Sequence, residues 1–546
     1  MSHLIGPHLR RLHHHSAADT DVTERYATRD DYPPWKGGVT MFCSADEHEE
    51  EPVIPSLALF KTLTPNDDDD DDDDDDDGSI TNEDGAISSD GVPSPSAPSP
   101  SPSSSPLLSV LPTVGECAVH LELLESFFAL RRKVLASAPL DEVFEVPKTN
   151  RTVFRVNKSK NILGRFEFTQ KPYKLKDTNW PAERKKKWPL FIGMAVQRFK
   201  AWIETADADK LLLVDDGGGF FRLRFLPPLG WNGKLTKGSY HVDVLMVWHA
   251  FLLNPKDFVT FCANQQLERI RHVHFPWAQI HSALDTKSDS YHYSLPEDAQ
   301  DWFRSVVGFA PDLFVGLVLA TPGSVERPTW IAFEDQQLAE NVHRQAGFVD
   351  KMHRHLWIRS PAAQGTLTRA VSRYDKFLRL LGLYRTKMLV PTLDIDLVWH
   401  THQLSAARYE ADTRARTGSY VNHDDKLGKP VLHDSLGETQ GLFYMRFGEQ
   451  YSICLCWDCE AVVSVLEERD AELEGDVMKL AKESIADMRD LVLQEVEYFR
   501  HVECSRRSKA GRYNKKIKNR LPVRRVNAPP TGFGSSYNTA GKPLHS

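Results

Sequence analysis

A repeated pair of short motifs constrains the fold of this chain more than any other feature of its sequence. The segment GSYHVDVLMVWHAFLLNPKDF (238–258) aligns with PTLDIDLVWHTHQLSAARY (391–409), without a gap from Asp243 onward. A second match, AVQRFKAW (195–202) with AVSRYDKF (370–377), precedes each segment in the same order. Two matches in one order indicate an internal duplication. We therefore expect two related units, the first of them expanded between its two matching segments.

The apolar residues of both motifs recur at helical spacing, which predicts a mainly α protein with minor β structure. Short strands are expected only around 153–169, where polar and apolar residues alternate. The predicted helices span 120–135, 189–203, 240–262, 296–308, 335–357, 365–382, 392–416 and 460–502. The predicted parts of the chain are a disordered acidic and Ser/Pro-rich arm (1–114), a first helical unit with an insertion (115–330), a second helical unit (331–460), a long amphipathic C-terminal helix (461–504) and a disordered basic tail (505–546).

The arm and the tail carry opposite charges. Asp67–Asp77 is an unbroken run of eleven aspartates, and removing these charges changes the formal net charge from −9 to +2. The run repels itself and Ser94–Pro106 has little to bury, so both favour disorder. Arg500–Val526 carries eleven Lys or Arg against one acid, Glu503. Basic segments of this kind are typical of nuclear localisation or of nonspecific contact with nucleic acid.

Cysteine content and hydropathy indicate the cellular compartment of the protein. Seven cysteines in 546 residues are too few for a disulfide scaffold, which favours a reducing compartment. No apolar run approaches the ~18–20 residues of a membrane span. The N-terminal MSHLIGPHLRRLHHH is interrupted by His and Arg, unlike a signal peptide. We therefore expect an intracellular protein, in the cytoplasm or the nucleus, with no membrane partner.

Several motifs of the second unit resemble one known family. PTLDIDLVWHTHQL (391–404), GSYVNHDD (418–425) and FYMRFGEQY (443–451) are similar to the glycine-rich domain-containing protein-like family of plants and fungi. CLCWDCE (454–460) resembles the fungal branch of that family. The resemblance implies the same duplicated helical architecture, but the molecular activity of the family is undefined. The glycine-rich tail of the plant members has no counterpart here.

Polar side chains in the helix predicted near 392–408 are the first candidates for a functional site. Thr392 is the expected N-cap of this helix. At helical spacing Asp396 and His400 share a face, and an aspartate there orients the imidazole. His400 and His402 point about 200° apart, so a regular helix cannot direct both to one metal. The candidate polar site comprises Asp394, Asp396, Trp399, His400 and His402, with His423, Asp424 and Asp425 of the following loop.

Two interpretations of this helix remain open. In the first, His400 and Asp396 join His423 and Asp425 in a metal or catalytic site. In the second, Trp399 and His400 pack one unit against the other. The repeat equivalents bear on this choice: Asp243, Trp248 and His249 recur in the first unit, where Leu245 replaces Asp396 and Phe251 replaces His402.

The family resemblance also brings an enzymatic alternative. Its fungal members are often labelled 2-oxoglutarate-dependent sulfonate dioxygenases, a class that holds Fe(II) with a His-x-Asp pair and a distant histidine. His241-x-Asp243 and His423-x-Asp425 fit that pair. The chain contains five His-x-Asp/Glu pairs, so the pattern is not specific. Such enzymes also need a barrel of many strands, whereas this sequence predicts helices.

A second candidate metal site follows the second unit. Cys454, Cys456 and Cys459 form a C-x-C-x-x-C motif. Three thiolates with a fourth ligand, Cys504 or His433, would bind zinc in a tetrahedron. The alternative is that these cysteines are small buried residues at the start of a helix. The cofactors to consider are thus zinc and iron.

The sequence as a whole favours an intracellular binding or scaffolding protein that takes protein partners in the groove between its two units. A metal-dependent enzyme built on Asp396, His400 and the loop 423–425 is the first alternative. A nucleic-acid-associated factor acting through the basic residues 505–526, which include the cluster 515–525, is the second, and another basic cluster lies at 184–187. Because residues 505–526 contain a single aromatic residue, Tyr513, they lack a base-stacking platform. No small-molecule substrate is indicated.

Overall fold

The computed structural model describes residues 54–63, 111–147, 151–160, 162–175, 177–208, 213–215, 221–223, 241–286, 291–294, 297–325, 333–423, 429–472 and 482–509. This part of the chain is mostly helical, which confirms the predicted fold class. Its strands form three separate two-stranded antiparallel sheets: β1 (Arg151–Lys160) with β2 (Phe166–Leu175), β3 (Leu213–Asp215) with β4 (Phe221–Leu223), and β5 (Leu284–Asp285) with β6 (His292–Tyr293).

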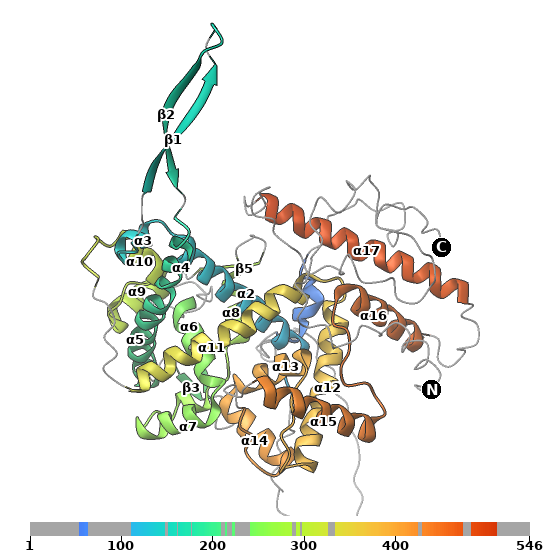
Figure 1. The fold of residues 1–546 in the computed structure, drawn as a ribbon. Coiled ribbons are helices and arrows are strands. Elements are labelled where there is room, and N and C mark those ends of the chain that lie inside the picture. The colour runs from blue at the N-terminus through green and yellow to red at the C-terminus, as the bar shows by residue number, and fades with distance from the viewer. Residues whose placement is uncertain are drawn as a thin grey trace, which may run out of the picture.

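The two predicted units contain the same succession of helices. The first has α5 (Lys187–Ala208), α6 (Val242–Leu252) and α7 (Pro255–Asn264), and the second has α12 (Ala363–Leu383), α13 (Leu393–Gln403) and α14 (Ala406–Thr417). In each unit the first helix packs along the second, and the third follows the second directly. Figure 1 shows the first unit in green and the second in gold and orange.

Each of the long helices predicted at 240–262 and 392–416 is in fact two helices. The breaks fall at Asn254 and Ser405, which are equivalent positions in the repeat. Both residues are N-caps with nearly the same backbone, at φ −117°, ψ 70° for Asn254 and φ −107°, ψ 79° for Ser405. Pro255 explains the first break, because it lacks the N–H that would continue the helix. Ser405 breaks the second helix without a proline, so periodicity alone could not reveal it.

A buried ion pair holds the first two helices of each unit together. Arg198 Nε lies 2.6 Å from Asp243 Oδ2, and Arg373 Nε lies 2.6 Å from Asp394 Oδ2. The arginines are equivalent in the AVxR motifs and the aspartates are equivalent in the second motifs. An aromatic contact accompanies each pair: ring centroids are 5.2 Å apart for Trp202 and Trp248, and 5.4 Å apart for Phe377 and Trp399, which are again equivalent pairs.

The same arginines reveal a third matching element. Arg198 donates to the carbonyls of Ala310 and Pro311, and Arg373 donates to those of Gln450 and Tyr451. Each pair of carbonyls follows a helical segment, which is α9 (Glu297–Trp302) with the π-helical turn η4 (Phe303–Val307) in the first unit and α15 (Lys429–Phe447) in the second. Gln300, Phe303 and Gly308 align with Gln440, Phe443 and Gly448, and both glycines have positive φ, 81° and 67°. Shared contacts at all three elements support the predicted duplication.

Two long helices, α2 (Val114–Ala136) and α11 (Phe333–His355), fill the space between the units. Eleven consecutive residues of α2, Cys117–Phe127, are buried, because the helix packs against α5 and α6 of the first unit and α12 and α13 of the second. α11 packs against α2, α5 and α6. α2 and α11 therefore lie where the sequence analysis expects a groove between the units (Figure 1).

One short stretch of the arm predicted as disordered is folded. The 3-10 helix η2 (Leu57–Leu63) packs against α2, with Leu59 buried, and Arg359 donates to the carbonyl of Ile54. The hydrophobic residues of LALF provide the apolar surface that this contact requires. The triple histidine, the aspartate run, the Ser/Pro segment and the tail after 509 lie outside the described residues.

The predicted strands around 153–169 form the β1–β2 hairpin, which extends away from the helices (Figure 1). The predicted C-terminal helix is two helices, α16 (Trp457–Glu472) and α17 (Lys482–Lys509), which pack together. The remaining short elements are α3 (Pro139–Val143), α4 (Trp180–Lys185), η3 (Ile270–His272), α8 (Trp277–Ala283), α10 (Leu313–Leu319) and η5 (Trp357–Arg359). No helix in the described part of the chain is long and apolar enough to cross a membrane.

Candidate metal centre

The candidate site lies at the start of α13 and on the segment that follows α14. Asp396 and His400 are one turn apart on α13, as predicted, and Thr392 is the N-cap residue. The Thr392 hydroxyl accepts a hydrogen bond from Arg373 and makes no cap bond of its own, so the expected side-chain cap is absent among the described contacts. α14 ends at Gly418, whose φ of 74° favours glycine and lets the chain turn back toward α13.

A chain of hydrogen bonds fixes the returning segment. Trp399 Nε1 donates to the hydroxyl of Tyr409 at 2.8 Å, and that hydroxyl donates to the carbonyl of Val421 at 2.9 Å. The ring of His423, two residues later, stands edge-on to Trp399 with ring centroids 4.7 Å apart. Trp399 therefore acts as a positioning residue, because it holds His423 over α13.

His423, Asp396 and His400 converge in space. His423 Nε2 lies 3.2 Å from Asp396 Oδ1, and His400 Nε2 lies 3.4 Å from the same oxygen. One donor atom from each residue falls within 4.8 Å of the other two. All three belong to the candidate polar site of the sequence hypothesis, while Asp424 and Asp425 lie outside the described residues.

His400 is buried without the hydrogen bonds that a buried imidazole usually makes. Its residue is 2% exposed, and neither Nδ1 nor Nε2 has a hydrogen-bond partner among the described residues. His423 Nδ1 is buried and likewise lacks a partner there. Native structures leave few buried polar atoms unsatisfied, and each such atom calls for an explanation. The other face of the His400 ring packs on Phe348, with centroids 4.3 Å apart.

The electrostatics of the triad favour a neutral imidazole beside an ionised carboxylate. Burial lowers the pKa of His400 to about 4, although Asp396 acts in the opposite direction. Burial raises the pKa of Asp396, but the imidazoles of His400 and His423 and the ammonium of Lys351 lower it by more, so the pKa lies below its ordinary value. A neutral imidazole and a carboxylate are the protonation states that bind a metal ion.

The other polar residues of α13 have structural partners. Asp394 pairs with Arg373, and His402 lies between the hydroxyl of Tyr374, 3.0 Å from Nδ1, and Asp412, 3.1 Å from Nε2. His400 and His402 therefore point to different surroundings, as the helical spacing predicts. Neither Asp394 nor His402 belongs to the triad.

The equivalent histidine of the first unit makes a different set of contacts. His249 Nε2 lies 3.0 Å from His120 Nε2, and His120 Nδ1 lies 2.8 Å from Thr401 Oγ1. Because the Thr401 hydroxyl donates to the carbonyl of Leu397, it must accept from His120 Nδ1–H. The pKa of His120 is well below its usual value because of burial and the neighbouring His249 and His400, so His120 is neutral and its Nε2 accepts from His249.

This chain of contacts crosses from α6 through α2 to α13. It joins His249 of the first unit to Thr401, the residue after His400 in the second unit, which agrees with the packing interpretation for His249. Asp243 and Trp248 serve the same packing, and Leu245 supplies no carboxylate there. His120 was missed in the sequence because nothing in the HLELLESFF helix distinguishes it from a surface histidine.

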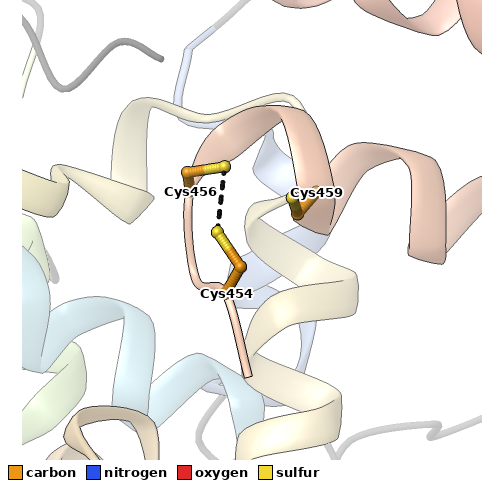
Figure 2. Close-up of side chains that lie close together, drawn as sticks. All are labelled: Cys454, Cys456 and Cys459. Atoms are coloured by element: carbon orange, nitrogen blue, oxygen red, sulfur yellow. Dashed lines mark hydrogen bonds between the residues drawn. The ribbon is translucent and has the colours of Figure 1, made fainter. Parts of the chain in front are cut away.

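The three cysteines also lie together, on the loop before α16 and on its first turn (Figure 2). Cys454 Sγ lies 3.4 Å from Cys456 Sγ, and the three sulfurs are within 4.8 Å of one another. All three residues are partly exposed and none forms a disulfide. The side chains of Cys504 and His433, the predicted fourth ligands, lie outside the described residues.

The structure gives less support to the dioxygenase hypothesis and to the basic cluster 184–187 than to the two candidate metal sites. The carboxylate of Asp243 is bound by Arg198, so it is not available to join His241 as a metal ligand, and the described residues form no barrel. In the cluster 184–187, Arg184 and the buried Lys187 both pair with Asp141. Half of this predicted nucleic-acid contact is therefore a structural ion-pair network that joins α3, α4 and α5.

Comparison with known proteins finds a family match that includes Asp396 and His400 and ends before His423. Residues 324–412, which include α11 to the middle of α14, match the family described as glycine-rich domain-containing protein-like. Glycine-rich domain-containing protein 2 of Arabidopsis thaliana is 29% identical over 220 residues, which are 38% of this chain and 26% of that protein. Glycine-rich domain-containing protein 1 of the same plant is 44% identical over 93 residues, 16% of this chain and 11% of that protein. No solved structure matches. Residues 324–412 therefore resemble the glycine-rich domain-containing protein-like family, and the chain spans about a quarter or less of the length of these two plant relatives.

Proposed function

We propose that this protein binds a divalent transition-metal ion through Asp396, His400 and His423. The observation that carries the proposal is the burial of His400 without a hydrogen bond to either ring nitrogen among the described residues, while its Nε2 lies 3.4 Å from the carboxylate of Asp396 and a second imidazole is close by. A packing histidine would be expected to hydrogen bond, as His402, His120 and His249 do. His400 differs from them in just this respect.

The spacing of the donor atoms supports the proposal. Metal–nitrogen and metal–oxygen bonds of about 2.1 Å place neighbouring ligand atoms about 3.0–3.4 Å apart in octahedral or tetrahedral geometry. The two contacts to Asp396 Oδ1 measure 3.2 and 3.4 Å. Two histidines and one carboxylate suit zinc or Fe(II), and both leave coordination positions that the protein does not fill.

The surroundings of the triad favour binding from one side. Phe348 covers His400, while the side chains of Asp396 and His423 are 20% and 11% exposed, so access to the ion would pass these two residues. A bound ion would act as a Lewis acid or, as iron, in oxygen chemistry. Metal-dependent catalysis, the enzyme alternative, would then use the exposed side, where Lys351 adds a positive charge that favours an anionic substrate.

Metal content tests the proposal. The full-length protein is loaded with Zn(II) or Fe(II), desalted and measured by elemental analysis. We expect Asp396→Asn and His423→Gln each to lose one metal ion per chain and to retain their helical circular dichroism. His281→Gln is the matched control, because His281 Nδ1 lies 2.7 Å from Glu122 in another histidine–carboxylate pair outside any three-ligand group of the described residues. Equal metal content in all four proteins would overturn the proposal.

A second candidate function is binding of single-stranded nucleic acid through the β1–β2 hairpin. Residues 151–175 carry seven Lys or Arg and a single acid, Glu167. The register pairs Lys158 with Phe168 and Lys160 with Phe166 on the face that also carries Phe154. The side chain of Phe154 is 66% exposed, that of Phe168 is 64% exposed and that of Phe166 is 54% exposed. Glu167 lies on the opposite face.

Aromatic rings interleaved with cations are the features that bind single strands, since bases stack on the rings and the phosphates meet the lysines. Residues 505–526 have only Tyr513, whereas the hairpin supplies several such rings. Apolar side chains this exposed on a water-soluble hairpin also indicate a partner surface.

Fluorescence anisotropy with a labelled oligo(U) and oligo(dT) tests this second function. We expect Phe154→Ala/Phe168→Ala to weaken binding at least tenfold, and the wild-type affinity to fall as salt rises. Val153→Ala/Tyr173→Ala, on the opposite face of the same hairpin, is the matched control and should retain most of the affinity. Salt-insensitive binding, equal loss in both variants, or binding only to anionic lipid vesicles would contradict it.

A further inference from the structure

The cysteine loop before α16 is held rigidly by two tryptophans. Trp357 Nε1 donates to the carbonyl of Leu455, which lies between Cys454 and Cys456, at 2.9 Å. In return, Trp457 Nε1 donates to the carbonyl of His355 at 2.8 Å. Both indoles are buried, 1% exposed each. These reciprocal bonds fix the loop against η5 before any ligand binds.

The first turn of α16 brings the third thiol to the same place. The backbone N–H of Glu460 donates to the carbonyl of Cys456 at 3.0 Å, so the helix begins directly after the loop. Cys459 therefore lies in the first turn of α16, and its sulfur is within 4.8 Å of the other two sulfurs (Figure 2). A metal–sulfur bond of about 2.3 Å places the sulfurs of a tetrahedral zinc site about 3.8 Å apart. The observed sulfur positions lie on this scale.

The three sulfurs are close enough to bind one ion together. Cys454 Sγ and Cys456 Sγ are 3.4 Å apart, and all three sulfurs lie within 4.8 Å of one another at a partly exposed site. A zinc ion bound there would replace the thiol protons.

We propose that Cys454, Cys456 and Cys459 form a zinc site that fastens α16 and α17 to the body of the protein. The position of the site in the fold supports a structural role. Asp458 pairs with Arg500 of α17 at 2.6 Å, and Glu460 pairs with Arg369 of α12. Cys459 lies between Asp458 and Glu460 in the sequence. An ion bound to its sulfur would therefore restrict the motion of the turn that carries both ion pairs.

This inference is independent of the His–Asp centre. The cysteine site lies on the loop before α16 and on the first turn of α16, and none of its ligands belongs to the triad of Asp396, His400 and His423. The thiolates select zinc over Fe(II) among the ions considered above, because soft sulfur ligands suit zinc. Binding releases the remaining thiol protons to solvent and involves no change of oxidation state.

Cobalt substitution and metal analysis test the site in the full-length protein. Zinc-loaded wild type should hold two zinc ions per chain if both sites are filled, and Cys456→Ser/Cys459→Ser should lose one of them. Co(II) added to metal-free protein should produce sulfur-to-cobalt charge-transfer absorption in the near ultraviolet, which the same variant should lack. Cys262→Ala removes a single buried cysteine and is the control, with an unchanged spectrum expected.

The variants separate the two proposals. Asp396→Asn should retain the cobalt–thiolate absorption, and the double cysteine variant should retain the ion lost in Asp396→Asn. Adding Cys504→Ser shows whether the fourth ligand comes from the sequence position predicted for it, since the absorption should then weaken. Cobalt spectra without sulfur bands in the wild type, or zinc content unaffected by the cysteine changes, would overturn the zinc site.

Discussion

His400 and His249 occupy equivalent positions in the repeat, but their environments have diverged. His249 hydrogen bonds to His120 on α2, and Leu245 stands where the second unit has Asp396. His400 lies beside Asp396 and His423 with no hydrogen bond from its ring nitrogens in the described part of the chain. Leu245 offers no donor atom at the position of Asp396, so His249 lacks the carboxylate that stands beside His400.

Stability should fall in mild acid because of the buried histidines. Burial lowers the pKa of His249 to about 3, below the ordinary value of 6.5. As the pH falls below 6.5, His249 becomes protonated in the unfolded chain but stays neutral in the folded protein. The free energy of unfolding therefore decreases by about 1.4 kcal/mol per pH unit for this group. The loss continues until the pH reaches the pKa of the folded state.

Urea denaturation from about pH 7 to pH 5 measures this effect. His249→Leu should reduce the pH dependence by the contribution of one histidine. His292→Ala removes an exposed histidine and should leave the pH dependence unchanged. A wild-type slope equal to that of His249→Leu would show that His249 titrates normally in the folded protein.

At the scale of the elements, the arginine–aspartate pairs define how the first two helices of each unit pack. Arg198 and Arg373 are 2% and 7% exposed, and each guanidinium donates both to an aspartate and to two carbonyls at the end of the third matching element. Removing one partner of a buried pair leaves the other charge unpaired in a medium of low polarity.

Arg198→Ala and Arg373→Ala should therefore each lower the free energy of unfolding by about 3–5 kcal/mol. Arg304→Ala is the control, since Arg304 forms an ion pair with Asp301 in which both side chains are mostly exposed, and its loss should cost less than about 1 kcal/mol. Chemical denaturation monitored by circular dichroism gives these values. Similar costs for Arg198 and Arg373 are expected from the duplication, and a neutral effect at either would contradict it for that unit.

Much of the architecture could be predicted from the sequence, because helical periodicity and the repeat are local signals. The helices α5, α11 and α12 and the shared face of Asp396 and His400 depend only on residues three or four apart. α15 was missed because Gly437 and Gly441 lower its helix propensity, while buried Phe443 and Thr439 stabilise it through tertiary packing. The contacts of His120 and of η2 could not be predicted either, because their partners lie far away in the sequence.

At the scale of the whole molecule, α2 makes one body of the two units. It is buried on nearly every side and contacts helices of both, so neither unit has a complete core without it. The predicted division at residue 330 suggests two separately folded domains, and this arrangement differs from that. Because α2 and α11 lie between the units, the exposed hairpin and the metal sites are the better candidates for binding.

Weakening α2 should therefore loosen both units together. Leu124 is 1% exposed in α2, and Leu124→Ala should cost about 2–5 kcal/mol through lost packing. Hydrogen exchange measured by mass spectrometry should show faster exchange in peptides from α6 and from α13 alike. Leu319→Ala, at an exposed position of α10, is the control. Faster exchange confined to one unit would show that the units unfold separately.

The central claim is that Asp396, His400 and His423 hold a metal ion, and anomalous X-ray diffraction from crystals of the zinc-loaded protein tests it most directly. The expected result is an anomalous peak at the zinc edge within bonding distance, about 2.1 Å, of a carboxylate oxygen of Asp396 and one ring nitrogen of each histidine. A well-ordered triad with no such peak, its three side chains hydrogen bonded only to one another and to water, would contradict the account.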